Sequence, residues 1–124
     1  QSLADRIEEM SAHLHAEIIP GTFIAKEGDA LVGSAALLES DMDIHKDLSP
    51  WLASVFVSPS HRGKGIGASL VKHLMAVAKE SGIKELYLFT PSKESFYKRL
   101  GWTTLVKEEY RGASVTIMSV KLND

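Results

Sequence analysis

The chain has 124 residues, a length that fits one domain over residues 1–124 with its own hydrophobic core. Hydrophobic residues make up 44%, charged residues make up 24% and the net charge is −2, which argues against a nucleic-acid-binding protein. The absence of cysteine excludes disulfides, thiolate metal ligands and a cysteine nucleophile. No apolar run reaches the roughly 20 residues of a membrane span and there is no signal-peptide pattern, so we expect a cytoplasmic protein with no membrane partner.

The N-terminal part predicts a helix followed by a β-hairpin. Apolar residues at helical spacing predict a helix over 2–16, and Pro20-Gly21 ends that segment. Strands are predicted at 22–26 and 30–38. Between them, Glu27-Gly28-Asp29 is typical of a tight hairpin turn because glycine accepts a positive φ.

The rest of the chain alternates strands with two helices. A polar connection over 39–50 leads to the strand Trp51–Val57, whose dense apolar run is typical of a central strand. A helix follows the glycine-rich stretch and ends at Gly82. The later elements are a strand at 84–90, a short helix at 92–100 and two strands at about 103–109 and 113–122. This order indicates an α+β sheet in which only the middle pair of strands need be parallel.

The glycine-rich stretch Arg62-Gly63-Lys64-Gly65-Ile66-Gly67 lies between a predicted strand and a predicted helix. The N-terminus of a helix offers unpaired backbone N–H groups and the positive end of its dipole, and glycines let the backbone approach an anion. The stretch therefore predicts a pyrophosphate site. Two alternatives are a plain glycine-rich turn and a nicotinamide-dinucleotide site. Gly63-x-Gly65-x-x-Ala68 matches a permissive form of the dinucleotide fingerprint.

Two stretches together resemble the GNAT superfamily of N-acetyltransferases: WLASVFVSPSHRGKGIGASLVKHLMAVAKESGIKELYLFT and SFYKRLGW. The first carries the superfamily signature Arg/Gln-x-x-Gly-x-Gly/Ala, and the second is similar to its C-terminal motif of an aromatic pair before Gly-aromatic. The resemblance covers about residues 17–122. It implies a mixed, splayed β-sheet flanked by helices, acetyl-CoA as cofactor, and acetyl transfer to a primary amine of a small molecule or peptide.

The resemblance also implies which residues bind the cofactor. Backbone groups of Val55, Phe56 and Val57 would pair with the pantetheine arm and the acetyl carbonyl, as an added strand does. Backbone amides of the glycine-rich stretch would hold the pyrophosphate, and the residues concerned are Arg62, Gly63, Lys64, Gly65, Ile66, Gly67 and Ala68. Thr90 would lie across the splay as a further contact, where many members carry Asn.

By the same resemblance, Tyr97 would be the general acid. Acetyl transfer from a thioester expels a thiolate, which a nearby phenol can protonate, while strand N–H groups hold the oxyanion. The competing interpretation is a core aromatic beside Phe96 and Leu100. Since no cysteine can carry the acetyl group, we expect direct transfer in a ternary complex.

The general base is unassigned at this point. Some members carry a strand-borne Glu, and here Ser54 and Phe89 occupy those stretches. Other candidates in the polar connection are Glu39, Asp41, Asp43 and His45. Because a strand-borne base is missing, a non-catalytic CoA-binding or sensing domain stays open as an alternative.

The remaining expectations concern the sheet edge, metals and aromatic residues. The chain begins at Gln1, and we expect the superfamily's first strand and helix to be missing, which would favour a homodimer through the open edge. His13 and His15 face apart on a helix, so we expect no metal. We expect Trp102 to lie in the core, and Trp51 to lie either in the core or in a wall of the acceptor pocket.

Overall fold

The computed structural model describes residues 6–9, 21–42, 44–45 and 47–122. The strands are β1 (Arg6–Glu9), β2 (Gly21–Glu27), β3 (Ala30–Leu38), β4 (Trp51–Val57), β5 (Glu85–Thr90), β6 (Thr103–Tyr110) and β7 (Ala113–Lys121). The helices are α1 (Ile66–Glu80) and α2 (Glu94–Arg99), and a 3₁₀ turn, η1 (Pro59–His61), precedes α1. From β2 onward every predicted helix and strand is confirmed, although α2 is shorter than predicted.

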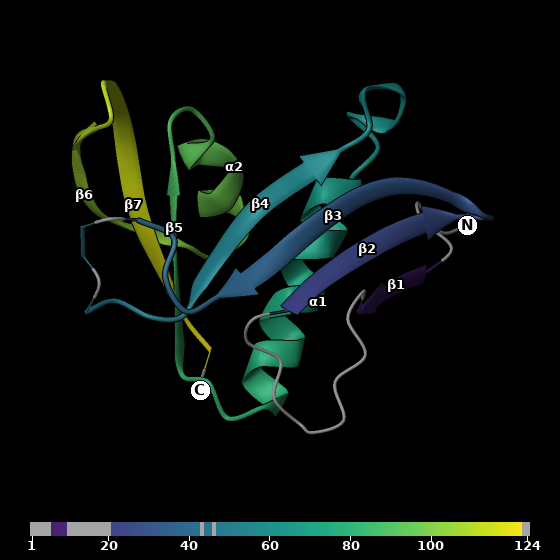
Figure 1. Cartoon of the computed structure of the whole chain (residues 1–124), viewed down its shortest axis with the longest axis horizontal. Coiled ribbons are helices and arrows are strands. Elements are labelled where there is room, and N and C mark those ends of the chain that lie inside the picture. The colour runs from purple at the N-terminus through teal and green to yellow at the C-terminus, as the bar shows by residue number, and fades with distance from the viewer. Residues whose placement is uncertain (1–5, 10–20, 43, 46, 123–124) are drawn as a thin grey trace.

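The strands form one sheet in the order β1-β2-β3-β4-β5-β7-β6 (Figure 1). Neighbouring strands are antiparallel except β4 and β5, which run parallel. Parallel strands need a crossover, and α1 supplies it between β4 and β5. The predicted α+β class, with its single parallel pair at the centre, is confirmed.

Strand β1 corrects the sequence prediction at the first edge of the sheet. The helix predicted over 2–16 is wrong at Arg6–Glu9, which pair antiparallel with β2 and place Ile7 opposite Ala25. Pairing with the open edge of β2 overrides the weak helical pattern of this short segment. The sheet thus has an edge strand where we expected the first strand to be missing. The other residues of that predicted helix lie outside the described residues.

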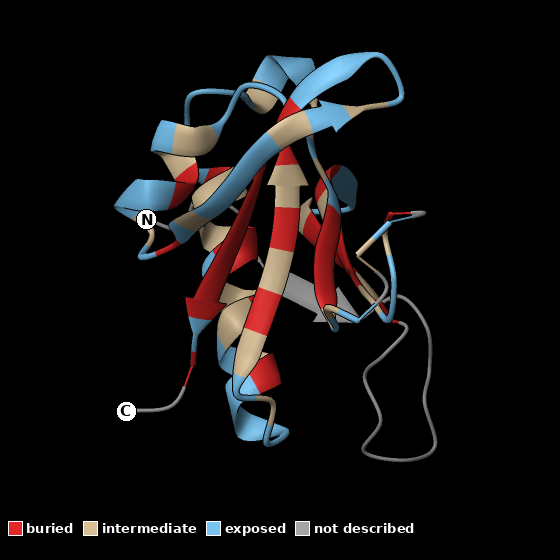
Figure 2. Ribbon diagram, turned by 90° about the vertical axis from the view of Figure 1, so that its left-hand side faces the viewer, coloured by how far each residue is buried: buried red, intermediate tan, exposed pale blue. Residues whose placement is uncertain are grey.

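Helix α1 covers one face of the sheet because its apolar side chains recur at helical spacing. Its buried residues are Ile66, Leu70, Val71, Leu74 and Ala78. They join strand residues such as Phe23, Val32 and Leu52 in the main core, whose burial along the central strands is visible in Figure 2. Gly33 on β3 allows the close approach of α1, because a Cβ there would lie 3.0 Å from Leu70 Cδ1.

A second, smaller core occupies the other face of the sheet, since successive strand residues point to opposite sides. It consists of Met42, Trp51, Val115 and Ile117. Trp51 is fully buried, and its indole Nε1 donates to Leu48 O at 2.6 Å. Trp102 is buried in the main core instead. The core position expected for Trp102 is confirmed, and of the two positions expected for Trp51 the structure shows the core.

Strands β4 and β5 separate soon after they meet. Their ladder contains a single residue pair, Trp51 opposite Tyr87. One backbone bond, from Tyr87 N–H to Pro50 O at 3.0 Å, closes the parallel pair at its base. Beyond that point the two strands diverge (Figure 1). The splay expected from the resemblance is therefore present, and it leaves one edge of β4 without a strand partner toward β5.

Candidate active site

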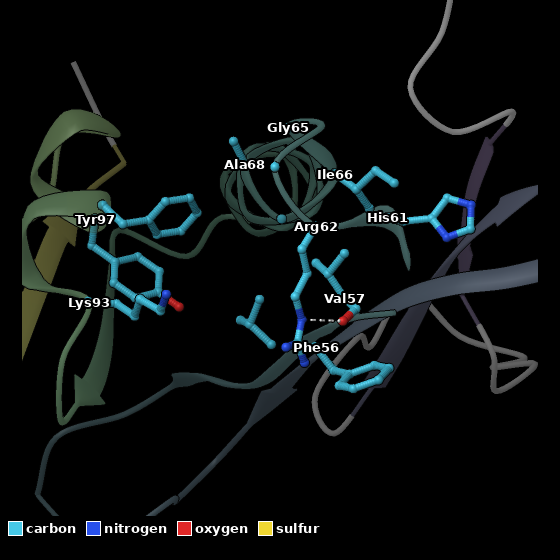
Figure 3. A pocket seen from close by; sticks show the side chains of 13 residues that line it. Phe56, Val57, His61, Arg62, Gly65, Ile66, Ala68, Lys93 and Tyr97 are labelled. Atoms are coloured by element: carbon cyan, nitrogen blue, oxygen red, sulfur yellow. Dashed lines mark hydrogen bonds between the residues drawn. The ribbon is translucent and has the colours of Figure 1, made fainter. Parts of the chain in front are cut away.

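A cavity of about 560 Å³ opens where β4 ends, between the loop before α1 and the helix α2 (Figure 3). It is lined by Val55, Phe56, Val57, His61, Arg62, Gly63, Gly65, Ile66, Gly67, Ala68, Lys93, Phe96 and Tyr97. We call it the first cavity. It brings together every predicted cofactor residue except Lys64 and Thr90, and it adds the predicted acid Tyr97 from a separate segment.

The turn into α1 presents backbone N–H groups to this cavity. Gly63 and Gly65 adopt positive φ values of 80° and 82°, which side chains disfavour. The first backbone bond of the helix runs from Ser69 N–H to Gly65 O at 3.0 Å. Gly65 is the N-cap, no side chain caps this end of α1, and its first turn contains no acidic residue. The amides of residues 66–68 are therefore available to an anion.

The charged side chains around the first cavity are all basic. Arg62 folds back so that its Nε donates to Val57 O at 3.1 Å, which keeps the guanidinium beside the cavity (Figure 3). Lys93 and His61 are the other basic lining residues, and none of the lining residues is acidic. His61 Nε2 lies 3.0 Å from Glu27 Oε1 and links the turn to the end of β2. This lining fits a polyanion.

Gly67 keeps the first cavity open between β4 and α2. A Cβ added there would lie 3.5 Å from Val57 Cγ2 and 3.7 Å from Phe96 Cζ. Those are ordinary contact distances, so glycine is not needed to avoid a clash in the chain itself. What glycine provides is space between two apolar walls for a ligand that follows the start of α1.

A β-bulge interrupts β4 beside the splay. Ser34 faces Phe56 and Ala36 faces Ala53, so β4 contains one residue more than β3 in this stretch. Ser54 takes up the extra length with φ 57°, an uncommon value for a residue other than glycine. The bulge redirects the backbone of residues 55–57 at the point where a ligand would add to the free edge of β4.

Tyr97 is both a core residue and a cavity residue. Its ring packs edge-on against Phe96 at 4.9 Å and against Trp102 at 6.0 Å between centroids, and the residue is 8% exposed. Burial raises the pKa of its phenol above the ordinary value. A raised pKa keeps the phenol protonated at neutral pH, so the hydroxyl is available as a proton donor.

A second cavity of about 420 Å³ lies in the splay itself. It is lined by Asp41, Leu52, Ala53, Ser54, Val55, Leu88, Phe89, Thr90, Pro91, Ser92, Lys93 and Tyr97. It shares Val55, Lys93 and Tyr97 with the first cavity. Tyr97 therefore stands at the boundary of the two cavities.

Thr90 belongs to the second cavity. It is 5% exposed, and its Oγ1 accepts the N–H of Lys93 at 3.0 Å and of Ser92 at 3.4 Å. The hydroxyl thus fixes the turn that leads from β5 into α2. The predicted contact between Thr90 and the cofactor stays a prediction.

Helix α2 is tied to β6 through Glu94. The Glu94 carboxylate accepts a hydrogen bond from the Thr104 hydroxyl and lies 3.0 Å from Lys107 Nζ and 3.4 Å from Lys98 Nζ. The bond from Thr104 and the contact with Lys107 lower the pKa of Glu94 to about 2. These contacts hold the helix that carries Tyr97.

Several cavity residues were not found by sequence reasoning. Lys93 lines both cavities, and helical spacing contained a signal for it, because Tyr97 N–H donates to Lys93 O at 3.1 Å one turn away. Phe96, the residue next to Tyr97, lines the first cavity only. Asp41 lines the second cavity, whereas the sequence named it only as one acid among several.

Other candidates lie elsewhere. His45 Nε2 lies 3.0 Å from Glu108 Oε1, and His45 lines neither cavity. Asp43, His13 and His15 are outside the described residues. Within the described ranges, no cluster of three or more His, Asp or Glu could hold a metal ion. No helix in the described part of the chain is long and apolar enough to cross a membrane.

Fold and site together define a class of domain: a mixed sheet, split at its one parallel pair, with an uncapped helix start at the split. The family model of the acetyltransferase (GNAT) domain matches residues 20–104. The chain belongs to this family.

Particular relatives agree with this assignment. Over 59 residues, 48% of this chain, the sequence is 36% identical to an uncharacterised N-acetyltransferase of Chlorobaculum tepidum, and it spans only 37% of that protein. The fold is similar to an IAA acetyltransferase from Bacillus cereus, with a TM-score of 0.67 and 20% identity over 82% of this chain and 77% of that one. It is also similar to a GNAT family acetyltransferase from Elizabethkingia anophelis with acetyl-CoA bound, with a TM-score of 0.67 and 16% identity over 82% and 76%.

Proposed function

We propose that this chain is an N-acetyltransferase that takes the acetyl group of acetyl-CoA and transfers it to a primary amine. The observation that carries the proposal is the first cavity, where uncapped amides and basic side chains lie within one space that ends at a buried, protonated phenol. Acetyl-CoA, when bound, supplies an activated thioester and a diphosphate.

Each part of the first cavity has a separate task. The amides of residues 66–68 and the Arg62 guanidinium bind the diphosphate at the start of α1. The free edge of β4 at Val55–Val57 pairs with the amide-containing arm of the cofactor. The bulge at Ser54 aims a β4 backbone N–H at the acetyl carbonyl.

Tyr97 donates a proton to the sulfur that leaves. With acetyl-CoA bound, the Tyr97 hydroxyl, whose pKa is raised by burial, would still hold its proton and could give it to the departing sulfur.

The test is release of free thiol from acetyl-CoA in the presence of a panel of primary amines. Tyr97→Phe should lower kcat by about 100-fold or more and leave the Kd of the coenzyme unchanged. Tyr87→Phe is the matched control, because Tyr87 lines neither cavity and should keep full activity.

Each contrary outcome has a distinct meaning. Unchanged kcat in Tyr97→Phe contradicts the acid role. Coenzyme binding without thiol release from any amine favours a non-catalytic CoA-binding domain. Calorimetry that detects NAD and no coenzyme A contradicts the proposal as a whole.

A further inference from the structure

The second cavity contains a carboxylate, that of Asp41, which no side chain in the described part of the structure neutralises. Asp41 follows β3, and the loop around it is fixed by its neighbours: Ser40 Oγ donates to Met42 O at 3.3 Å, and Met42 is 3% exposed beside Trp51. With Met42 anchored in the smaller core, Asp41 lines the second cavity.

The environment of Asp41 is unfavourable for a bare carboxylate. Among the described residues, none forms an ion pair or hydrogen bond with it. Burial raises the pKa of Asp41, and no cation among the described residues offsets the lost hydration. A positively charged ligand in this cavity would supply the missing partner.

The position of Asp41 matches what acetyl transfer needs. The second cavity shares Tyr97 and Val55 with the first cavity, and none of the residues at the start of α1 lines it. Lys93 is the other charged residue of its lining, and its ammonium disfavours a second positive charge on the ligand.

We infer that Asp41 binds the acceptor as its ammonium ion and takes the first proton from it, so that the substrate is a small, singly charged primary amine entering through the second cavity. This inference rests on the proposed function. A general base works best when its pKa is raised toward the operating pH, which the burial of Asp41 provides.

The proton balance closes. The ammonium gives one proton to the Asp41 carboxylate, which later releases it to water, and the freed nitrogen lone pair forms the new C–N bond as the C–S bond breaks. The second nitrogen proton ends on the departing sulfur through the Tyr97 hydroxyl. The products are an N-acetyl amine and a free thiol.

The test compares two amines of similar size, ethylamine and trifluoroethylamine. At neutral pH ethylamine is charged, whereas trifluoroethylamine is largely neutral. Asp41→Asn should raise the KM of ethylamine about tenfold or more and that of trifluoroethylamine much less. Asp41→Glu should recover part of the loss. Glu39→Gln is the matched control, because it removes the same charge two residues away from an exposed position outside both cavities.

The outcomes separate this inference from the proposed function. Equal KM changes for the two amines in Asp41→Asn overturn the ammonium role, and so does a Glu39→Gln effect as large as that of Asp41→Asn. If the unmodified chain binds coenzyme A and acetylates neither probe, the assignment of the second cavity to a small ammonium is wrong. If it does not bind coenzyme A, the proposed function itself fails.

Discussion

The two cavities on either side of Tyr97 differ most in their charge. The first cavity has three basic side chains and no acidic one, and it adds the unpaired amides of a helix start. The second has a carboxylate with no partner among the described residues and shares only Lys93 with the basic set. By its charge, the lining of the first cavity suits a polyanion, and we propose a cation as the ligand of the second.

This difference teaches how one interruption of a sheet can create two sites. The single residue pair between β4 and β5 leaves the strands split, and Val55 of β4 lines one cavity with the start of α1 and another with the end of β5. The loop before α1 supplies one side, and the loop after β3 supplies the other. Tyr97 on α2 touches both, so a reacting group from each side can meet at one hydroxyl. Asp41→Asn tests the second side, and the variants below test the first side and the attachment of α2.

Among the variants that test coenzyme A binding, the largest effect is expected from Gly67→Ala. The added methyl would occupy space between Val57 and Phe96 in the first cavity, so the Kd of coenzyme A should rise about tenfold or more. The free energy of unfolding should stay the same or increase by up to about 1 kcal/mol, because alanine reduces the conformational entropy of the unfolded chain. Calorimetry and thermal unfolding measure the two quantities.

Gly33→Ala should lower stability, in contrast to Gly67→Ala. A Cβ at Gly33 would lie 2.9 Å from Phe56 O, so this variant should lower the midpoint of thermal unfolding. A loss of stability in Gly67→Ala as large as that in Gly33→Ala would show that Gly67 serves packing and not the ligand.

A smaller effect is expected from Arg62→Gln. Removal of the guanidinium should weaken coenzyme A binding about fivefold, because a solvent-exposed, charge-assisted hydrogen bond contributes about that much to affinity. The difference from the unmodified chain should shrink as salt is added. Arg99→Gln, on α2 and outside both cavities, should bind as the unmodified chain does. A salt-independent loss would contradict a phosphate contact.

The smallest effect is expected from Glu94→Gln, which loosens α2 without touching either cavity. The pKa of Glu94 lies at about 2, below its ordinary value of 4.5, because of Thr104 and Lys107. A group with a lowered pKa contributes its full stabilisation at pH values above its ordinary pKa. This contribution of Glu94 disappears as the pH falls from 4.5 to about 2. Urea unfolding should therefore show the variant less stable at neutral pH and equal to the unmodified chain near pH 2. A pH-independent difference would contradict the ionic role.

Local patterns predicted the first side of the site well. The turn at residues 62–68 and the start of α1 depend on neighbours in sequence, so glycines with positive φ and the helix signal were sufficient. Tyr97 was named from a motif of the same local kind.

The second side depends on contacts that no local pattern contains. The bulge at Ser54 arises because β4 contains one residue more than β3 in this stretch. The extra residue is a serine with positive φ, a residue type that does not predict a bulge. Asp41, in the loop after β3, and Tyr97, on α2, are 56 positions apart in the sequence (97 minus 41) and come to line one cavity only when the chain folds. Strand β1 was missed because pairing with β2 outweighed its own helical pattern.

The most direct measurement follows backbone amide NMR shifts while coenzyme A and then ethylamine are added. We predict that coenzyme A changes the amide chemical shifts of residues 63–68 and leaves the amide shift of Asp41 unchanged. Ethylamine should then change the amide shifts of Asp41 and Ser54. Shifts from coenzyme A that bypass residues 63–68 would contradict the claim that the start of α1 is its phosphate site.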